Sequence, residues 1–360
     1  MNTSARINWT NTLFLTLTPL IGLFGTLYLV LSHQVSAATW VLAFVLYWVT
    51  GTAITAGYHR LFAHSTYRAV WPIRLIFLLL AAATFQGSVF EWSSDHRRHH
   101  RYTDTDKDPY NIQEGFWHAH INWLIFLDTK KRDFSNISDL TESLLARLQH
   151  RFFVPLAIIM GFVLPACLAS LWGEFWAGLI VAGALRITFV HHSTFCINSL
   201  CHMVGKTTYS QKISARDNGL SALFTFGEGY HNYHHQFPLD YRNGIRFYQF
   251  DPTKWLIALL SYLGLASNLR RIPKYRIIQA VIESHTPEET PSEEAHRHSA
   301  LMSSLRESIL ELIAHIKGLE KYCSETTGSL EAQQKIKTLS KELRRLFRAW
   351  HQLKALAYSS

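Results

Sequence analysis

Three short histidine clusters, separated by long apolar stretches, constrain most strongly how this chain can fold. They are His59-Arg-Leu-Phe-Ala-His64, His96-Arg-Arg-His99-His100 and His231-Asn-Tyr-His234-His235. In the second and third clusters the histidines stand at i, i+3 and i+4, on one face of a helix. The five-residue spacing within the first cluster favours a helix end. A single cluster of this kind is often a set of ordinary histidines. Three of them indicate a metal protein, because imidazole is the commonest protein ligand for transition metals.

The apolar residues come in long blocks, and 48% of the 360 residues are hydrophobic while only 17% are charged. A fifth block, Ile73–Phe90, is interrupted by Arg74 and Gln86, and we expect it to lie in the membrane interface or to re-enter the same side. The other blocks are each long enough to cross a bilayer, and they are Asn11–Leu31, Ala37–Tyr58, Phe152–Leu171 and Phe175–Val190. The sequence therefore predicts an all-α integral membrane protein with four transmembrane helices.

The number of crossings decides which side of the membrane carries the clusters. If the three clusters form one site, they share one side, and this holds only if Ile73–Phe90 does not cross. Lys and Arg gather on that side, whereas the loop Ser32–Ser36 on the other side has neither. By the positive-inside rule, the clusters and both termini are cytoplasmic.

The net charge and the cysteines exclude several classes of protein. The formal charge of +9 fits basic loops beside anionic lipid, and no arginine-rich helix with interleaved aromatic residues suggests nucleic-acid binding. The four cysteines form no CxxC pair and are expected to be reduced. The sequence also has no glycine-rich phosphate loop and no Gly-x-Ser-x-Gly elbow.

The character of the sequence changes after Pro273. We expect a membrane domain over residues 1–273, a polar linker over 274–298 and a helical hairpin over 299–360. Two apolar helical patterns, Leu301–Leu319 and Ile336–Leu353, flank a turn at Cys323–Ser329. The hairpin is expected to be cytosolic. It either docks a partner or covers its own apolar stripe, alone or against a second copy that would make a homo-oligomer.

The residue types in the clusters narrow the metal chemistry. Thiolates are absent, which argues against structural zinc and iron–sulfur sites. Soluble di-iron carboxylate proteins need two Glu-x-x-His pairs, and only Glu228-Gly-Tyr-His231 fits among the clusters. A nitrogen-rich site for two metals remains, in which neighbours such as His99 and His100 reach different ions. Asn198 and His202, four residues apart after the fourth block, could add an imidazole and a water-mediated amide. Alone, that pair would be ordinary polar capping.

Several further motifs accompany the clusters over about Thr10–Leu265. They are Glu91-Trp92-Ser-Ser-Asp95-His96, Asn198-Ser-Leu-Cys-His202, Gly227-Glu-Gly-Tyr-His-Asn-Tyr-His-His-Gln-Phe-Pro, Asp240-Tyr-Arg-Asn-Gly and Asp251-Pro-Thr-Lys-Trp255. With these motifs the sequence resembles the integral-membrane acyl-CoA desaturases of the stearoyl-CoA Δ9 type, in their bacterial form. The resemblance implies four spans in a cone beneath a cytosolic cap that holds two non-heme irons, in the bacterial inner membrane.

The resemblance also implies a reaction and a set of ligands. The family inserts a cis double bond, most simply at Δ9, into a saturated fatty acyl chain on coenzyme A, using O2 and two external electrons. An unactivated CH2 group has no acidic proton, so metal chemistry is required. The hairpin lacks a His-Pro-Gly-Gly motif, so we expect a separate electron donor of the ferredoxin, rubredoxin or cytochrome b5 type. Asn198 would hold a metal-bound water, and the implied iron ligands are His59, His64, His96, His99, His100, His202, His231, His234 and His235.

The substrate contacts are also carried over from the resemblance. Gln86, Trp92 and Thr194 match the positions that line the bend in the acyl chain, although each would also suit helix packing. At the headgroup the sequence departs from relatives that carry Asn, Arg and Arg-Lys, with Gly87, Ser94 and Leu127-Asp128 at these places. The nearby cations Lys130, Lys131 and Arg132 are candidates to replace that charge. Coenzyme A is expected as the carrier, while acyl carrier protein or phospholipid stays open.

Two other functions compete with desaturation. A membrane hydroxylase uses the same kind of histidine clusters and would leave oxygen in its product. A metal transporter would bind its ion near the bilayer midplane, whereas these clusters lie at or beyond the ends of the predicted spans.

Overall fold

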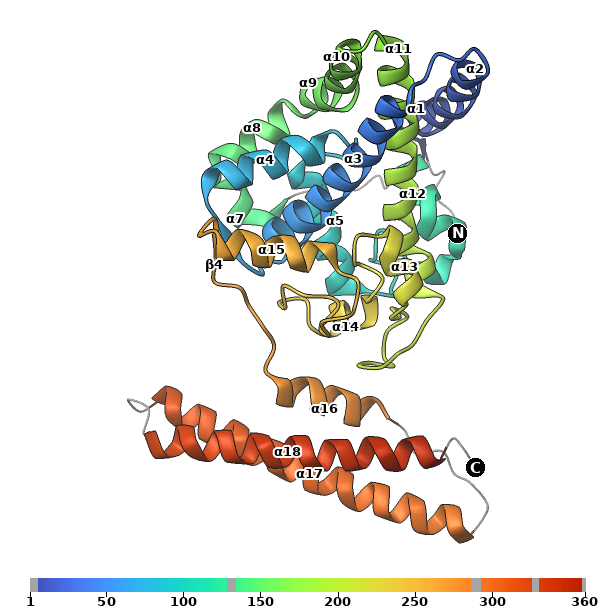
Figure 1. The fold of residues 1–360 in the computed structure, drawn as a ribbon. Helices are drawn as coiled ribbons and strands as arrows, with labels where there is room; N and C mark the ends of the chain where they lie inside the picture. The colour runs from blue at the N-terminus through green and yellow to red at the C-terminus, as the bar shows by residue number, and fades with distance from the viewer. Residues whose placement is uncertain (1–5, 128–133, 286–292, 326–329, 358–360) are drawn as a thin grey trace. The chain divides into compact units, whose positions relative to one another are not determined.

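The chain forms two compact units in the computed structural model, which describes residues 6–127, 134–285, 293–325 and 330–357 (Figure 1). The first unit consists of Met1–Lys206 and Lys212–Arg271. The second consists of Thr207–Gln211 and Ile272–Ser360. The boundary at Arg271 and Ile272 lies close to the predicted end of the membrane domain.

The predicted membrane spans are present in the first unit. Within the described residues, four helices are long and apolar enough to cross a membrane: Trp9–Leu31, Ala37–Ala63, Phe153–Ser170 and Phe175–His202. The second and fourth helices continue beyond the predicted limits, to Ala63 and His202. Every residue of Ile54–Ala63 is buried, so the continuation His59–Ala63 packs against other parts of the protein.

Each of these long helices contains a stretch of wider π-helical turns, which in proteins often mark functional sites. The elements are α1 (Trp9–Leu20), η1 (Ile21–Gly25) and α2 (Thr26–Leu31); α3 (Ala37–Ala53) and η2 (Ile54–Ala63); α9 (Phe153–Ile158), η6 (Ile159–Val163) and α10 (Leu164–Ser170); and α11 (Phe175–Ala177), η7 (Gly178–Leu185), α12 (Arg186–Asn198) and the 3-10 turn η8 (Leu200–His202).

The fifth apolar block, Ile73–Phe90, folds as a helix, a turn and the start of a second helix. The helix α4 (Trp71–Ala82) has 12 residues. Such a helix is about 18 Å long and cannot cross a hydrocarbon core of about 30 Å. After the turn Ala83–Gln86, α5 (Val89–Tyr102) begins with a capping box between Ser88 and Glu91. The prediction that this block does not span the membrane therefore agrees with the length of α4.

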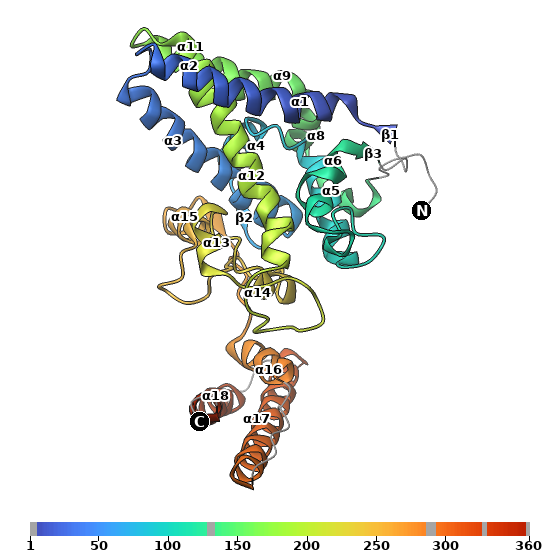
Figure 2. The ribbon, with the colours of Figure 1, turned by 90° about the vertical axis from the view of Figure 1, so that its right-hand side faces the viewer.

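Short helices and loops form the rest of the first unit, on the side where η2 and α12 end. The helical elements are η3 (Ile112–Glu114), η4 (His118–Asn122), α6 (Trp123–Ile125), η5 (Ser135–Ile137), α7 (Ser138–Thr141), α8 (Leu144–Arg151), α13 (Gly219–Phe224), α14 (His231–Gln236) and α15 (Pro252–Tyr262). In both views α3 and α12 run from the end with α2 and α11 toward α14 (Figures 1 and 2). α3 continues directly into η2, which carries His59, and α12 is followed by η8, which ends at His202.

Two short antiparallel pairs of strands close loops in this unit. β1 (Arg6–Ile7) pairs with β3 (Phe126–Leu127), and Arg6 lies opposite Leu127. β2 (Arg68–Ala69) pairs with β4 (Ala266–Ser267), and Arg68 lies opposite Ser267. The second pair fixes the chain just after the first histidine cluster to the end of α15.

The apolar core of the first unit lies between η2, α4, α5 and α15. Tyr58 and Phe62 from η2 pack with Leu78 of α4, Phe90 of α5 and Ile257 of α15, and all five are buried. Burial of a large apolar side chain stabilises a fold by roughly 1.5–3 kcal/mol. This core therefore holds in place the helix ends that carry the first two histidine clusters.

The second unit is a separate helical bundle. Its helices are α16 (Lys274–Ser284), α17 (Glu293–Glu325) and α18 (Leu330–Ala357). The hairpin of α17 and α18 follows the predicted apolar patterns, and α17 continues to Glu325, into the predicted turn. The structure differs in the predicted linker, because Lys274–Ser284 is helical and buries Ile278 and Ile282 in the core of the bundle.

Candidate metal centre

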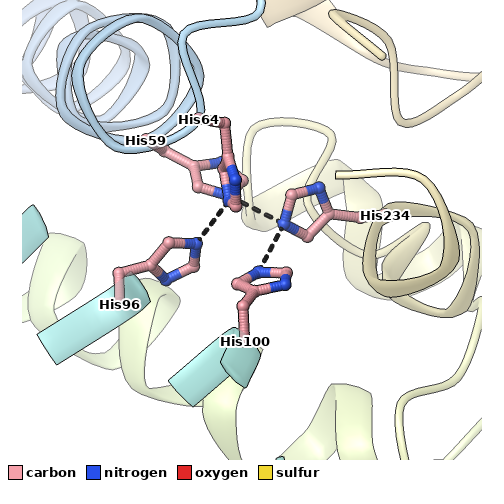
Figure 3. Close-up of side chains that lie close together, drawn as sticks. All are labelled: His59, His64, His96, His100 and His234. Carbon is pink, nitrogen blue, oxygen red and sulfur yellow. Dashed lines mark hydrogen bonds between the residues drawn. The ribbon is translucent and has the colours of Figure 1, made fainter. Parts of the chain in front are cut away.

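Four segments bring the histidine clusters together. His59 lies in η2 and His64 is its C-cap. The second cluster lies on α5, the third on α14, and His202 is the last residue of η8. Figure 3 shows side chains from η2, α5 and α14 pointing toward one another. The predicted helical placement of the second and third clusters is therefore present in the structure.

A first group of imidazoles forms around His234. His59 Nε2 lies 2.9 Å from His234 Nε2, which lies 2.9 Å from His100 Nε2. His64 Nε2 lies 2.8 Å from His96 Nε2. In these five residues, one ligand atom each lies within 4.8 Å of the others, and the group is His59, His64, His96, His100 and His234.

A second group lies beside the first. His231 Nε2 is 3.0 Å from His202 Nε2 and 3.1 Å from His235 Nε2, and His235 Nε2 is 3.2 Å from His99 Nε2. His99 belongs to this group whereas His100 belongs to the first, and His235 and His234 divide in the same way. Adjacent histidines therefore point to different groups, as their divergent directions on a helix predict. All nine histidines named from the sequence fall into the two groups.

Hydrogen-bond acceptors on the outer side of the imidazole rings determine which ring nitrogen carries the proton. Glu228 Oε2 lies 3.1 Å from His59 Nδ1, and Asp108 Oδ1 lies 2.8 Å from His99 Nδ1. A carboxylate accepts, so each Nδ1 carries the proton and each Nε2 presents a lone pair to its group. Ser214 Oγ lies 2.6 Å from His202 Nδ1 and is hydrogen-bonded to Asp104 in turn. This arrangement of second partners is typical of metal-binding histidines.

The donor set fits metal ions. Burial, followed by the neighbouring imidazoles, lowers the pKa of His96, His100 and His234 well below the usual value, so these rings are neutral. Neutral rings whose lone pairs converge at 2.8–3.2 Å repel one another unless a cation lies between them. Two such groups, with four and five nitrogens, are suited to two transition-metal ions.

A buried ion-pair network supports the first group. Arg60, with 1% of its surface exposed, donates to Glu228 at 2.9 Å and lies 3.0 Å from Asp251. Burial would raise the pKa of Glu228, but His59 and Arg60 outweigh it and lower the pKa to about 2. Asn243 also donates to Glu228. Glu228 therefore stays ionised and keeps its hydrogen bond to His59.

The residues that support the two groups could not be predicted from the sequence. In the sequence, Glu228 stands out only as part of a Glu-x-x-His pattern, whereas in the structure it lies behind His59 and belongs to neither group. Arg60 lies 191 residues before its partner Asp251, so spacing along the chain gives no signal for the pair. Asp108 follows His99 by nine residues, and its position in the Thr-Asp-Lys-Asp-Pro loop was the available hint.

The predicted substrate residues lie near the first group. Gln86 Nε2 donates to Thr194 Oγ1 at 3.0 Å, and Trp92 Nε1 donates to Gln86 Oε1 at 3.4 Å. The Trp92 ring stacks on His96 with 4.8 Å between centroids.

Asn198, the last residue of α12, is half-buried. Its role stays a prediction, and Lys130, Lys131 and Arg132 lie outside the described residues.

Comparisons with known proteins agree with this geometry. A sequence profile of the fatty acid desaturase family matches residues 35–266. A probable acyl-CoA desaturase of Schizosaccharomyces pombe is 43% identical over 280 residues, which are 77% of this chain and 58% of that protein. Acyl-CoA desaturase 1 of Saccharomyces cerevisiae is 40% identical over 286 residues, 78% of this chain and 55% of its own length.

A human protein is covered more completely. Stearoyl-CoA desaturase 5 of Homo sapiens is 37% identical over 277 residues, 75% of this chain and 82% of that protein. The chain thus spans little more than half the length of the two yeast relatives and most of the human one. The family match includes every histidine of both groups.

Proposed function

Because the chain belongs to the fatty acid desaturase family, we propose that it introduces a cis double bond into a saturated fatty acyl chain carried by coenzyme A. We propose Δ9 as the position of this double bond. The observation that carries this proposal is the pair of adjacent all-histidine groups at the ends of apolar spans. The names of the relatives support coenzyme A as the carrier of the acyl chain.

Two non-heme iron ions are the cofactors that we propose. When bound, they activate O2 for removal of hydrogen from an unactivated CH2 group. The reaction balances when O2 takes two hydrogens from the acyl chain, two external electrons and two protons, and leaves as two waters. Imidazole nitrogen suits iron, and the absence of thiolate from both groups disfavours a structural zinc site.

The residues of the chain have five tasks in this proposal. The nine histidines would hold the ions, and Glu228 and Asp108 hold the protons on the outer nitrogens of His59 and His99. Burial of both groups limits access of bulk water. Gln86, Trp92 and Thr194 shape the bend that brings one pair of carbons to the ions. Asn198 would hold a metal-bound water.

The orientation and the partners also belong to the proposal. The excess of Lys and Arg on the side of the clusters supports a cytoplasmic site and cytoplasmic termini. A separate ferredoxin, rubredoxin or cytochrome b5-type protein delivers the two electrons. A bacterial inner membrane and a homo-oligomer stay predictions from the sequence.

Product analysis tests the proposed function. The protein is expressed in a host without its own desaturase, together with an electron donor, and mass spectrometry locates any new double bond. Monounsaturated chains with one dominant bond position are expected. Hydroxylated chains would favour the hydroxylase, and products confined to phospholipid or acyl carrier protein would change the carrier.

A further inference from the structure

A buried arginine lies in the fourth span, away from the histidine groups. Arg186 has 2% of its surface exposed and lies within Phe175–His202. Within the described part of the chain it has no carboxylate partner. All three of its hydrogen bonds go to backbone carbonyls, those of Ala83 at 2.8 Å, Gly161 at 2.9 Å and Ala182 at 3.1 Å.

Burying a guanidinium without an opposite charge lowers the stability of the fold. The contacts of this guanidinium therefore indicate its function. The forked guanidinium contacts three segments, which are η7 through Ala182, η6 through Gly161 and the turn Ala83–Gln86 through Ala83. The approach is close, because a Cβ on Gly161 would lie 2.6 Å from the Phe85 ring and 3.0 Å from the Ala83 carbonyl oxygen. The turn is therefore fixed from two sides.

The turn itself is strained. Phe85 has φ +56°, a left-handed conformation that residues with a side chain rarely adopt. A second side chain of α12 holds the turn, since His191 Nε2 donates to the Thr84 carbonyl at 2.6 Å. Stacking of Phe85 on Phe14 at 4.8 Å adds a third contact. Such a conformation persists only where its surroundings enforce it.

The strained turn carries Gln86, the residue hydrogen-bonded to both Thr194 and Trp92. Trp92 in turn stacks on His96 of the first histidine group. A continuous series of contacts therefore runs from Arg186 through the Ala83–Gln86 turn to the metal centre. Arg186 touches neither the histidines nor, in this account, the reacting carbons.

We propose that Arg186 is a positioning residue that fixes the Ala83–Gln86 turn and thereby determines which carbons of the acyl chain lie at the ions. The inference rests on the proposed function, because it assigns Gln86 and Trp92 to the acyl bend. It explains why a cation is kept inside an apolar span. It also separates two tasks of α12, which holds the bend through Thr194 and the turn through Arg186 and His191.

The test replaces Arg186 in the full-length protein and measures the positions of the double bonds, the metal content per chain and kcat against KM. Arg186→Gln is expected to keep its metal and to raise the minor positional isomers at least tenfold. Arg186→Lys keeps the charge but lacks the forked geometry, and an intermediate isomer pattern is expected. Thr188→Val is the matched control, because it removes a buried hydrogen bond of the same helix to Ala184 without touching the turn.

The isomer pattern distinguishes positioning from a merely structural role. A variant with normal metal content, lower activity and the single wild-type isomer would overturn the inference. If Arg186→Gln does not fold, His191→Phe decides, because it removes the bond to the Thr84 carbonyl and keeps a ring; an unchanged isomer pattern would again refute the proposal. Wild-type protein that makes no double bond would instead refute the proposed function.

Discussion

The two units of this protein bury different kinds of side chain. The first encloses nine imidazoles and the ion-pair network of Arg60, Glu228 and Asp251. The second is held by apolar residues such as Ile313 and Trp350, and no charged side chain is buried among its described residues. Even a paired buried charge has a desolvation cost that an apolar side chain does not have, so the concentration of such charges in the first unit indicates function. The apolar core of the second unit explains how this unit folds and indicates no further role.

Loss of a single histidine ligand in the first unit should have the largest effect. His234→Ala and His235→Ala each remove an imidazole from a different group. We expect desaturation to fall below detection and the metal content to drop, while the protein still inserts in the membrane. His118→Ala is the control, because His118 belongs to neither group and contacts Glu114. Wild-type product from either ligand variant would exclude the ligand assignment.

Neutralising a supporting carboxylate should have the next largest effect. Glu228→Gln and Asp108→Asn remove the acceptor that fixes the proton on His59 or His99. Loss of such outer partners typically costs about 10–100-fold in metal affinity or activity. Metal titration of the purified variants measures the change in metal affinity. Glu114→Gln, at a carboxylate beside the half-exposed His118, is the matched control and should change nothing. Equal affinity in Glu228→Gln would show that the network serves stability only.

Charge reversal at the proposed headgroup contacts should have a smaller effect. Lys130→Glu, Lys131→Glu and Arg132→Glu together should raise the KM for acyl-CoA severalfold, because exposed charge contacts contribute ~0.2–1 kcal/mol each. The double-bond position should stay the same. Steady-state kinetics at low and high salt, in neutral detergent, provide the measurement. An unchanged KM at low salt would assign these cations to the membrane surface.

Removal of the second unit should have the smallest effect on chemistry. A chain shortened to end at Arg271 should keep its metal and its product when electrons are supplied. A chain ending near Pro287 should aggregate more after purification, because α16 would then expose Ile278 and Ile282. Product analysis and size-exclusion chromatography compare the two. Loss of product with intact metal in the shorter chain would give the second unit a part in electron delivery.

The sequence predicts what depends on local pattern. Apolar blocks give the spans, and the HxxHH spacing places three imidazoles on one face of α5 and of α14. Contacts across long separations could not be predicted, such as Arg60 with Asp251 or Arg186 with Ala83. The sequence predicts a linker where the structure has α16, because a helix of 11 residues is short and its apolar face finds a partner only in the bundle. The strained Phe85 likewise leaves no mark in the sequence.

Metal stoichiometry tests the central claim most directly. The purified full-length protein, analysed for iron, zinc and other transition metals, is expected to contain two irons per chain. His100→Ala and His231→Ala, one from each group, should each lower that number, whereas His118→Ala should leave it at two. A single zinc ion per chain, or an iron content that neither histidine variant changes, would contradict the account.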